Sequence, residues 1–210
     1  SFLFSAPLQA QTQPEPPSFN GFLTGPTSGD PLQIAMQYVQ SHGAAYGLSS
    51  TDLSELRVVD RYTTAHNGVT HIVLRQQLGG IDVFQGDIAV NVARDGSIIN
   101  VHNAAIPQLA KRVNTRTPKL SAQASLVQAA TTLGLHSSSL QGAPPDPVQS
   151  RAANGLEQAS EFVAAAYSVD PIPVHLIYQP LEDGSVVLAW NMVLRLPDGQ
   201  SWLDVRTDAT

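Results

Sequence analysis

The sequence predicts an α+β protein of two small units, each a helix packed on a curled antiparallel sheet. Two stretches, residues 31–46 and 121–133, carry apolar residues at spacings of three and four, which is typical of amphipathic helices. After each of them come segments in which apolar and polar residues alternate, the pattern of half-buried strands. Turn dipeptides separate these segments, namely Asn67-Gly68, Asp95-Gly96 and Asp183-Gly184.

The first unit is expected over residues 30–103. Its helix begins at Asp30-Pro31, because Asp is a favoured N-cap and Pro fits the first turn, and Gly47 ends it. Thr51 is the candidate N-cap of a short second helix. Four further segments, residues 57–65, 69–78, 81–92 and 97–102, then alternate with turn signals. We therefore expect a helix laid against a meander of about four strands.

The second unit is expected over residues 120–210, after a linker at residues 104–119. Ser121 caps a helix that stops at Gly134. Residues 141–150 are rich in Pro and predict a loop, and residues 155–167 could be helical or irregular. Three strands follow, over residues 174–178, 185–196 and 201–208.

Both ends of the chain suggest a longer precursor. Residues 1–29 read as the remnant of a secretory signal peptide followed by a Pro-rich linker. The chain stops at Thr210, directly after a strand-like run, so we expect the parent polypeptide to continue.

Composition excludes several classes of protein. The chain has 210 residues, of which 42% are hydrophobic, so a sizeable core can form. A net charge of −6 argues against a nucleic-acid-binding protein, which needs a basic patch. The absence of cysteine excludes disulfides, thiol catalysis and cysteine-based zinc sites. No apolar run reaches the roughly 18 residues that a membrane-spanning helix requires.

The sequence contains none of the common catalytic motifs. None of the six histidines lies in an H-E-x-x-H pattern, and we interpret them as scattered surface or half-buried residues. A G-x-S-x-G motif and a P-loop are also absent. Most aspartates fall at strand ends and turns, where the carboxylate bonds to the backbone. We therefore expect no catalytic, cofactor-binding or metal-binding residue in this chain, and no enzyme activity within it.

Residues 71–96 resemble a known family pattern. They contain a strand ending in Gln, a Gly-Ile bend, a strand of the D-x-x-V-N-V kind and an Asp-Gly turn. This order resembles the propeptide motif (FTP) shared by fungalysin and thermolysin-type zinc metallopeptidases. The matching positions are Gln76, Gly80, Ile81, Asp87, Asn91, Asp95 and Gly96. The preceding residues 46–53 are similar to the G-L-S and D-L lead-in of fungalysin propeptides.

The second half resembles the PepSY-type half of such propeptides. The run from Trp202 to Thr210 is similar to the W-x-D-V-x-x-D-A-x-T-G run that closes the propeptide region of the fungalysin family. Trp190, Trp202 and Asp208 fall on its strands. Each tryptophan is interpreted as either a core residue or an interface anchor.

The motif positions of the first half also allow two interpretations. Gln76, Asp87 and Asn91 either satisfy backbone groups and face solvent or contact the peptidase. Gly80 and Gly96 are interpreted as residues that the backbone geometry requires.

The resemblance implies two cystatin-like units that form the propeptide of a secreted, extracellular fungalysin-type zinc metalloendopeptidase. It implies one partner, the cognate peptidase catalytic domain, which the propeptide helps to fold and then inhibits. Zinc is expected in that domain, beyond Thr210, and no cofactor is expected in this segment. Nucleic acid and membrane are not expected partners of the mature form. The alternative is a stand-alone secreted cystatin-like module that binds proteins or inhibits a protease.

Overall fold

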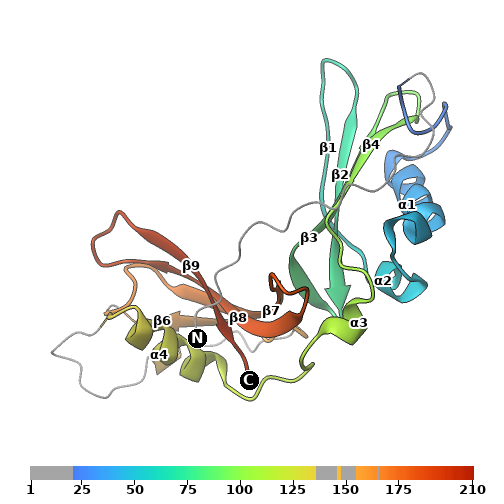
Figure 1. The fold of residues 1–210 in the computed structure, drawn as a ribbon. Coiled ribbons are helices and arrows are strands. Elements are labelled where there is room, and N and C mark those ends of the chain that lie inside the picture. Colours follow the sequence, from blue (N-terminus) through green and yellow to red (C-terminus); the bar gives the residue numbers. More distant parts are fainter. Residues whose placement is uncertain (1–20, 136–145, 148–154, 165) are drawn as a thin grey trace. The chain divides into compact units, whose positions relative to one another are not determined.

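A computed structural model describes residues 21–135, 146–147, 155–164 and 166–210 (Figure 1). These residues form two compact units. The N-terminal unit comprises residues 21–78 and 85–111, and the C-terminal unit comprises residues 79–84 together with the described part of 112–210. Each unit combines helix with antiparallel sheet, so the α+β class is confirmed. The expected signal remnant falls largely on residues 1–20, outside the described residues.

The first helix of the N-terminal unit, α1 (Pro31–His42), begins where the Asp-Pro signal predicts. It ends earlier than Gly47, because the chain tightens into the 3₁₀ turn η1 (Gly43–Tyr46). Gly47 caps that turn with a φ of 72°, a conformation that favours glycine. Gly47 is therefore a stop signal, as predicted, but it ends the 3₁₀ turn η1 and not the helix α1.

The predicted meander of four strands is confirmed. It consists of β1 (Arg57–Thr63), β2 (Thr70–Leu78), β3 (Ile81–Val92) and β4 (Ile98–Asn103), adjacent in chain order. The β1–β2 pair is antiparallel and the β3–β4 pair likewise. The hairpin at Asn67-Gly68 sets the β1–β2 register, in which Tyr62 lies opposite His71.

The core of the N-terminal unit lies between α1 and one face of this sheet (Figure 1). Residues such as Val39 on α1 meet Ile72 and Leu74 on β2, which are completely buried. Alternate residues of β2 and β3 point to the opposite face and are only half-buried. Among the described residues no helix covers this opposite face, and we call it the helix-free face.

A second short helix, α2 (Ser50–Ser54), is capped by Ser49, so the prediction of Thr51 as its N-cap is wrong. Ser49 and Asp52 form a capping box, in which each side chain bonds to the other residue's backbone N–H. Thr51 therefore lies inside the first turn. The serine with an acid three residues later is the stronger start signal.

Asp52 also holds a distant segment. Its buried carboxylate accepts hydrogen bonds from the amides of Gln108 (3.0 Å) and Leu109 (3.0 Å), at the start of α3 (Leu109–Arg112). Burial raises the pKa of Asp52, but the hydrogen bonds from Ser49, Gln108 and Leu109 outweigh it, so the pKa lies below its usual value.

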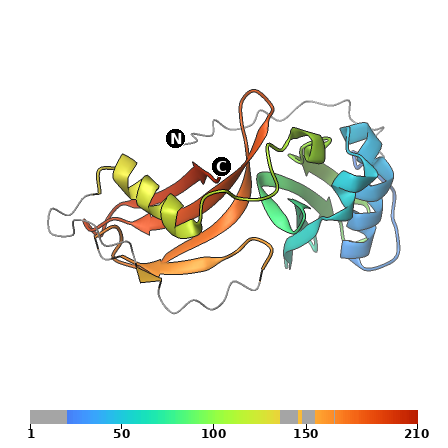
Figure 2. The ribbon, with the colours of Figure 1, turned by 90° about the horizontal axis from the view of Figure 1, so that it is seen from below.

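In the C-terminal unit, helix α4 (Ala122–Thr132) lies against one face of an antiparallel sheet (Figure 2). Ser121 caps the helix as predicted, because its hydroxyl accepts the Ala124 N–H at 3.2 Å. Four strands follow the order β6 (Ser160–Val163), β7 (Ile172–Pro180), β8 (Val186–Arg195) and β9 (Trp202–Asp208). The two-residue β5 (Asp146–Pro147) pairs with β6.

Two features of the C-terminal unit differ from expectation. Residues 155–167 were expected to be helical or irregular, but they contain a strand, β6, which pairing with β7 stabilises, so both alternatives are wrong there. In addition, Val83 from the start of β3 pairs in parallel with Tyr178 on β7. Within the described part of the chain, no helix is long and apolar enough to cross a bilayer.

The Asp52 contacts generate a pH-dependent prediction. The unfolded Asp52 has a pKa of about 3.9, so a lowered folded pKa contributes stability above that pH. This stability is lost as the pH falls below about 4. We expect Asp52→Asn to lower the opening free energy of the N-terminal unit by about 1–3 kcal/mol at pH 7 and by less at pH 3. Amide hydrogen exchange of peptides from residues 21–111 measures this quantity.

Asp60→Asn is the matched control, since Asp60 is exposed on β1, and it should change the opening free energy by less than about 0.5 kcal/mol. An Asp52→Asn effect of equal size at both pH values would contradict the assigned role of the carboxylate.

Candidate functional site

The helix-free face of the N-terminal unit carries a continuous line of polar contacts across all four strands. Tyr62 (β1), His71 (β2), Asn91 (β3) and Asn100 (β4) form it, and we call these four residues the polar row. The Tyr62 and His71 rings stack with centroids 4.6 Å apart. His71 Nδ1 lies 2.7 Å from Asn91 Oδ1, and Asn91 Nδ2 donates to Asn100 Oδ1 at 2.6 Å.

The hydrogen bonds of the polar row define the role of only one of the two ring nitrogens of His71. Because Asn91 Oδ1 can only accept, His71 Nδ1 carries a proton and donates it. The other ring nitrogen, Nε2, lies 2.9 Å from the Thr64 hydroxyl, which can either donate or accept.

Asp87 lies on the same helix-free face and forms a two-pronged ion pair. Arg75 donates from Nε to Asp87 Oδ1 at 2.8 Å and from Nη2 to Oδ2 at 2.9 Å. Both side chains are half-exposed, so this pair orders the surface more than it stabilises the fold.

Gln76 points to the other face and is completely buried. Its carboxamide donates to the Ile106 carbonyl at 2.9 Å and accepts the Ile106 N–H at 2.8 Å. The Gln76 side chain thus makes the two backbone hydrogen bonds that a neighbouring strand would otherwise make with Ile106. The geometry gives Gln76 a structural role.

Three of the other motif positions are explained by local backbone geometry. Gly80 has a φ of 75° in the tight turn before β3. Gly96 has a φ of 81°, and an added Cβ there would overlap the Thr27 carbonyl oxygen. Asp95 accepts the Ser97 N–H at 3.0 Å, and hydrogen bonds from Ser97 lower the pKa of its carboxyl. The remaining position, Ile81, directly follows Gly80, and its side chain is buried.

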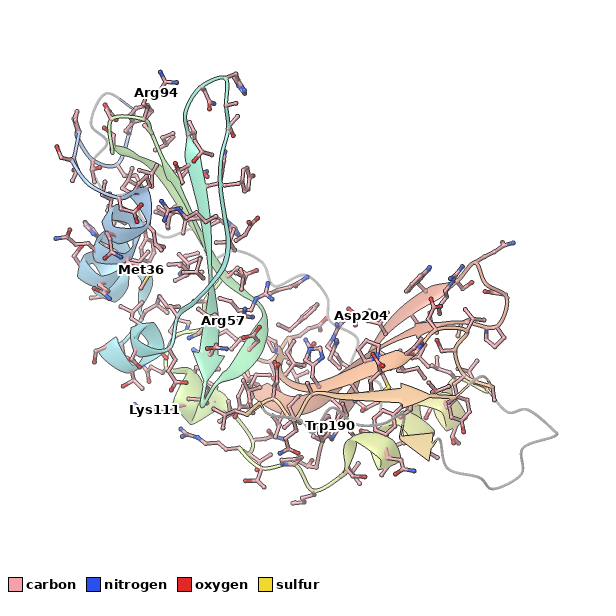
Figure 3. The ribbon with its side chains drawn as sticks, turned by 180° about the vertical axis from the view of Figure 1, so that it is seen from behind. Met36, Arg57, Arg94, Lys111, Trp190 and Asp204 are labelled. Carbon is pink, nitrogen blue, oxygen red and sulfur yellow. The ribbon has the colours of Figure 1, made fainter. Side chains whose placement is uncertain are left out.

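The two tryptophans, about which the sequence left two interpretations open, have different environments. Trp190 on β8 is 1% exposed, and its Nε1 donates to the Leu120 carbonyl at 2.9 Å (Figure 3). Trp202 on β9 is 61% exposed, with the Arg195 guanidinium 5.5 Å from its ring centroid. Asp208, at the end of β9, accepts the N–H and hydroxyl of Thr210.

The described residues contain no group of three or more His, Asp or Glu side chains that could hold a metal ion. A shallow pocket of about 480 Å³ lies beside α2 and α3, lined by residues that include Asp52 and Lys111. The Asp52 carboxylate already accepts four hydrogen bonds, and its lowered pKa makes it a weak base.

The polar row as a unit was not predicted from the sequence. Asn91 is a motif position, but His71 was interpreted as one of the scattered histidines, and Tyr62 and Asn100 carried no prediction. A signal was available, because the Asn67-Gly68 turn fixes the register that places Tyr62 opposite His71.

The buried contacts of Gln76 predict a stability effect. Gln76→Ala leaves the N–H and carbonyl of Ile106 unpaired in the interior, and we expect the opening free energy of the N-terminal unit to fall by about 2–4 kcal/mol. Hydrogen exchange of residues 21–111 measures it. Gln40→Ala, at an exposed position of α1, should have almost no effect. Equal behaviour of the two variants would show that the Gln76 contacts contribute nothing.

Comparison with known proteins agrees with the position of these features. Residues 54–105, which include all of β1–β4, match the family described as "Fungalysin/Thermolysin Propeptide Motif". The chain is 29% identical over 163 residues to "Probable extracellular metalloproteinase 3" of Trichophyton verrucosum, covering 74% of this chain and 24% of that protein. It is 28% identical over 159 residues to "Extracellular metalloproteinase mep" of Aspergillus fumigatus, covering 73% and 23%.

A solved structure, the "Bacillus megaterium YpeB C-terminal domain", aligns with 89% of this chain and 62% of its own, at 13% identity and a TM-score of 0.33. The chain spans about a quarter of the length of the metalloproteinases that it matches. It carries the fungalysin/thermolysin propeptide motif at residues 54–105 and resembles the propeptide of a fungalysin-type metallopeptidase.

Proposed function

We propose that this chain is the propeptide of a secreted zinc metalloendopeptidase, and that it acts as an intramolecular chaperone and an inhibitor of the peptidase domain. The observation that carries the proposal is the propeptide motif, which coincides with the complete β1–β4 meander. The extracellular metalloproteinases that align with most of this chain support secretion.

The surface of the chain suits association with a large protein partner. Charged residues make up only 13% of the sequence, about half the usual share, and they are depleted from the centres of protein interfaces. On the helix-free face, Val73 and Ala89 are half-buried between the polar row and the Arg75–Asp87 pair. This face is mildly polar and no helix of the described residues covers it, so it can serve as a docking surface.

In this proposal the chain supplies binding and not catalysis. The polar motif residues pair with backbone groups, as Gln76 does, or with neighbouring side chains, as Asn91 and Asp87 do, and none is arranged as a nucleophile with its base. The described residues contain no group of three or more His, Asp or Glu side chains that could hold a metal ion, and in this proposal the catalytic zinc lies in the peptidase domain. Inhibition requires only that the bound propeptide blocks the substrate cleft.

A stand-alone secreted binding module remains the second candidate. An α+β unit with exposed sheet edges is also compatible with a separate inhibitor of a foreign protease. The two candidates differ in the parent gene. The propeptide predicts that a peptidase with an H-E-x-x-H motif is encoded in the same reading frame, whereas a stand-alone module predicts a stop shortly after Thr210.

An inhibition and refolding assay tests the propeptide function. We expect the isolated chain, added in excess to the mature peptidase of the same precursor, to inhibit peptide cleavage and to raise the yield of refolded peptidase. Gln40→Ala should behave like the wild type, whereas Gln76→Ala should be less effective at temperatures where its N-terminal unit opens. Absence of both inhibition and refolding assistance by the wild-type chain would exclude the proposed function.

A further inference from the structure

The outer edge of β9 is available to a further strand. The Ala209 N–H donates to the Leu188 carbonyl, and the Leu196 N–H donates to the Ser201 carbonyl. Because hydrogen-bonded pairs alternate along an antiparallel ladder, the odd-numbered residues of β9 face β8. The backbone N–H and C=O groups of Trp202, Asp204 and Arg206 therefore point outward. Within the described residues, no backbone hydrogen bond reaches this edge.

Charged side chains on an edge strand often prevent another strand from pairing with it, but Asp204 and Arg206 of β9 are paired with each other. Arg206 donates to Asp204 at 2.7 Å and to Asn191 at 3.2 Å, and its guanidinium lies 3.8 Å from the centre of the Phe84 ring. Its side chain is consequently only 10% exposed. The charges of Arg206 and Asp204 therefore neutralise each other within β9. Asp204 (Figure 3) is held in place by this ion pair.

Trp202 is the first residue of β9, and its apolar side chain is exposed to solvent. Arg195, which lies over its ring, is itself fixed by Asp170 at 3.2 Å and by the Gly199 carbonyl at 3.2 Å. A side chain that is already ordered loses little entropy when a partner covers it. Exposed tryptophans of this kind are enriched among residues that dominate protein interfaces.

Two other strand edges, those of β1 and β4, are less suitable. The register of β1 shifts between Val58 and Asp60, and such bulges blunt an edge. The outer edge of β4 is covered where Leu23 donates to the Ile98 carbonyl and Ile98 donates to the Thr24 hydroxyl. In contrast, β9 pairs with β8 over seven consecutive residues without a shift.

We propose that the outer edge of β9, anchored by Trp202, is a strand-addition site for an extended segment of the peptidase domain. This inference rests on the proposed function and specifies where the partner binds. The occupant is a segment that can adopt β structure and that places an apolar side chain against the indole of Trp202. The relatives match this chain over only about a quarter of their length, so a partner of sufficient size lies outside the match.

A binding experiment with paired variants tests the site. The dissociation constant is measured between the mature peptidase of the same precursor and the full chain. We expect Trp202→Ala to weaken binding at least about tenfold. Val163→Ala, which removes an exposed apolar side chain of β6, should change binding less than about twofold. Asp204→Pro removes an outward N–H at a position where an edge strand tolerates proline, and we expect a loss similar to that of Trp202→Ala.

Fluorine NMR of the chain labelled with 5-fluorotryptophan supplies a readout that does not depend on how the variants fold. Trp202→Phe assigns the two resonances, and in the complex the Trp202 signal should shift or broaden while that of buried Trp190 stays in place.

A complex in which the Trp202 signal does not change, or an unaltered affinity of Trp202→Ala, overturns the strand-addition site and leaves the proposed function intact. Dimerisation of the chain through β9, detected by light scattering and abolished by Trp202→Ala, also overturns it, because a second copy would then occupy the edge. If the wild-type chain does not bind the peptidase, both the proposed function and the strand-addition site on β9 are excluded.

Discussion

The N-terminal unit depends on two buried polar side chains that pair the backbone of residues 106–109. This segment follows β4 and enters the interior without a neighbouring strand. Gln76 supplies both hydrogen bonds for Ile106, and the Asp52 carboxylate receives the amides of Gln108 and Leu109. Unpaired backbone groups in the interior would be costly, so these side chains determine the path of the chain out of the sheet.

The elements that the sequence predicted correctly are those specified by neighbouring residues. The helix start at Pro31, the hairpin at Asn67-Gly68 and the cap at Ser121 each depend on contacts within a few residues. The misplaced cap at Thr51 is also local, since the capping box formed by Ser49 was readable. In contrast, β6 became a strand through pairing with β7, which lies ten or more residues further along the chain.

The candidate site was harder to predict because it depends on which side chains share a face and on their exposure. The resemblance to propeptides identified Gln76 and Asn91 together, yet they point to opposite faces of the sheet, one to the core and one to the polar row. Likewise, Trp190 and Trp202 lie on adjacent strands and in similar sequence patterns. Only the structure separates them, because Trp190 reaches the Leu120 carbonyl beneath α4 while Trp202 lies on the edge strand.

The chain-order meander of β1–β4 has a consequence for biosynthesis. The strand pairs within this meander join neighbours in the sequence, and sheets with such local pairing assemble faster than sheets with distant partners. Ribosomes deliver only about 5–20 residues each second, which is slow compared with hairpin formation. In a precursor of the proposed kind, the N-terminal unit would be complete while later segments are still being translated. A nascent peptidase would therefore emerge beside a surface that has already folded.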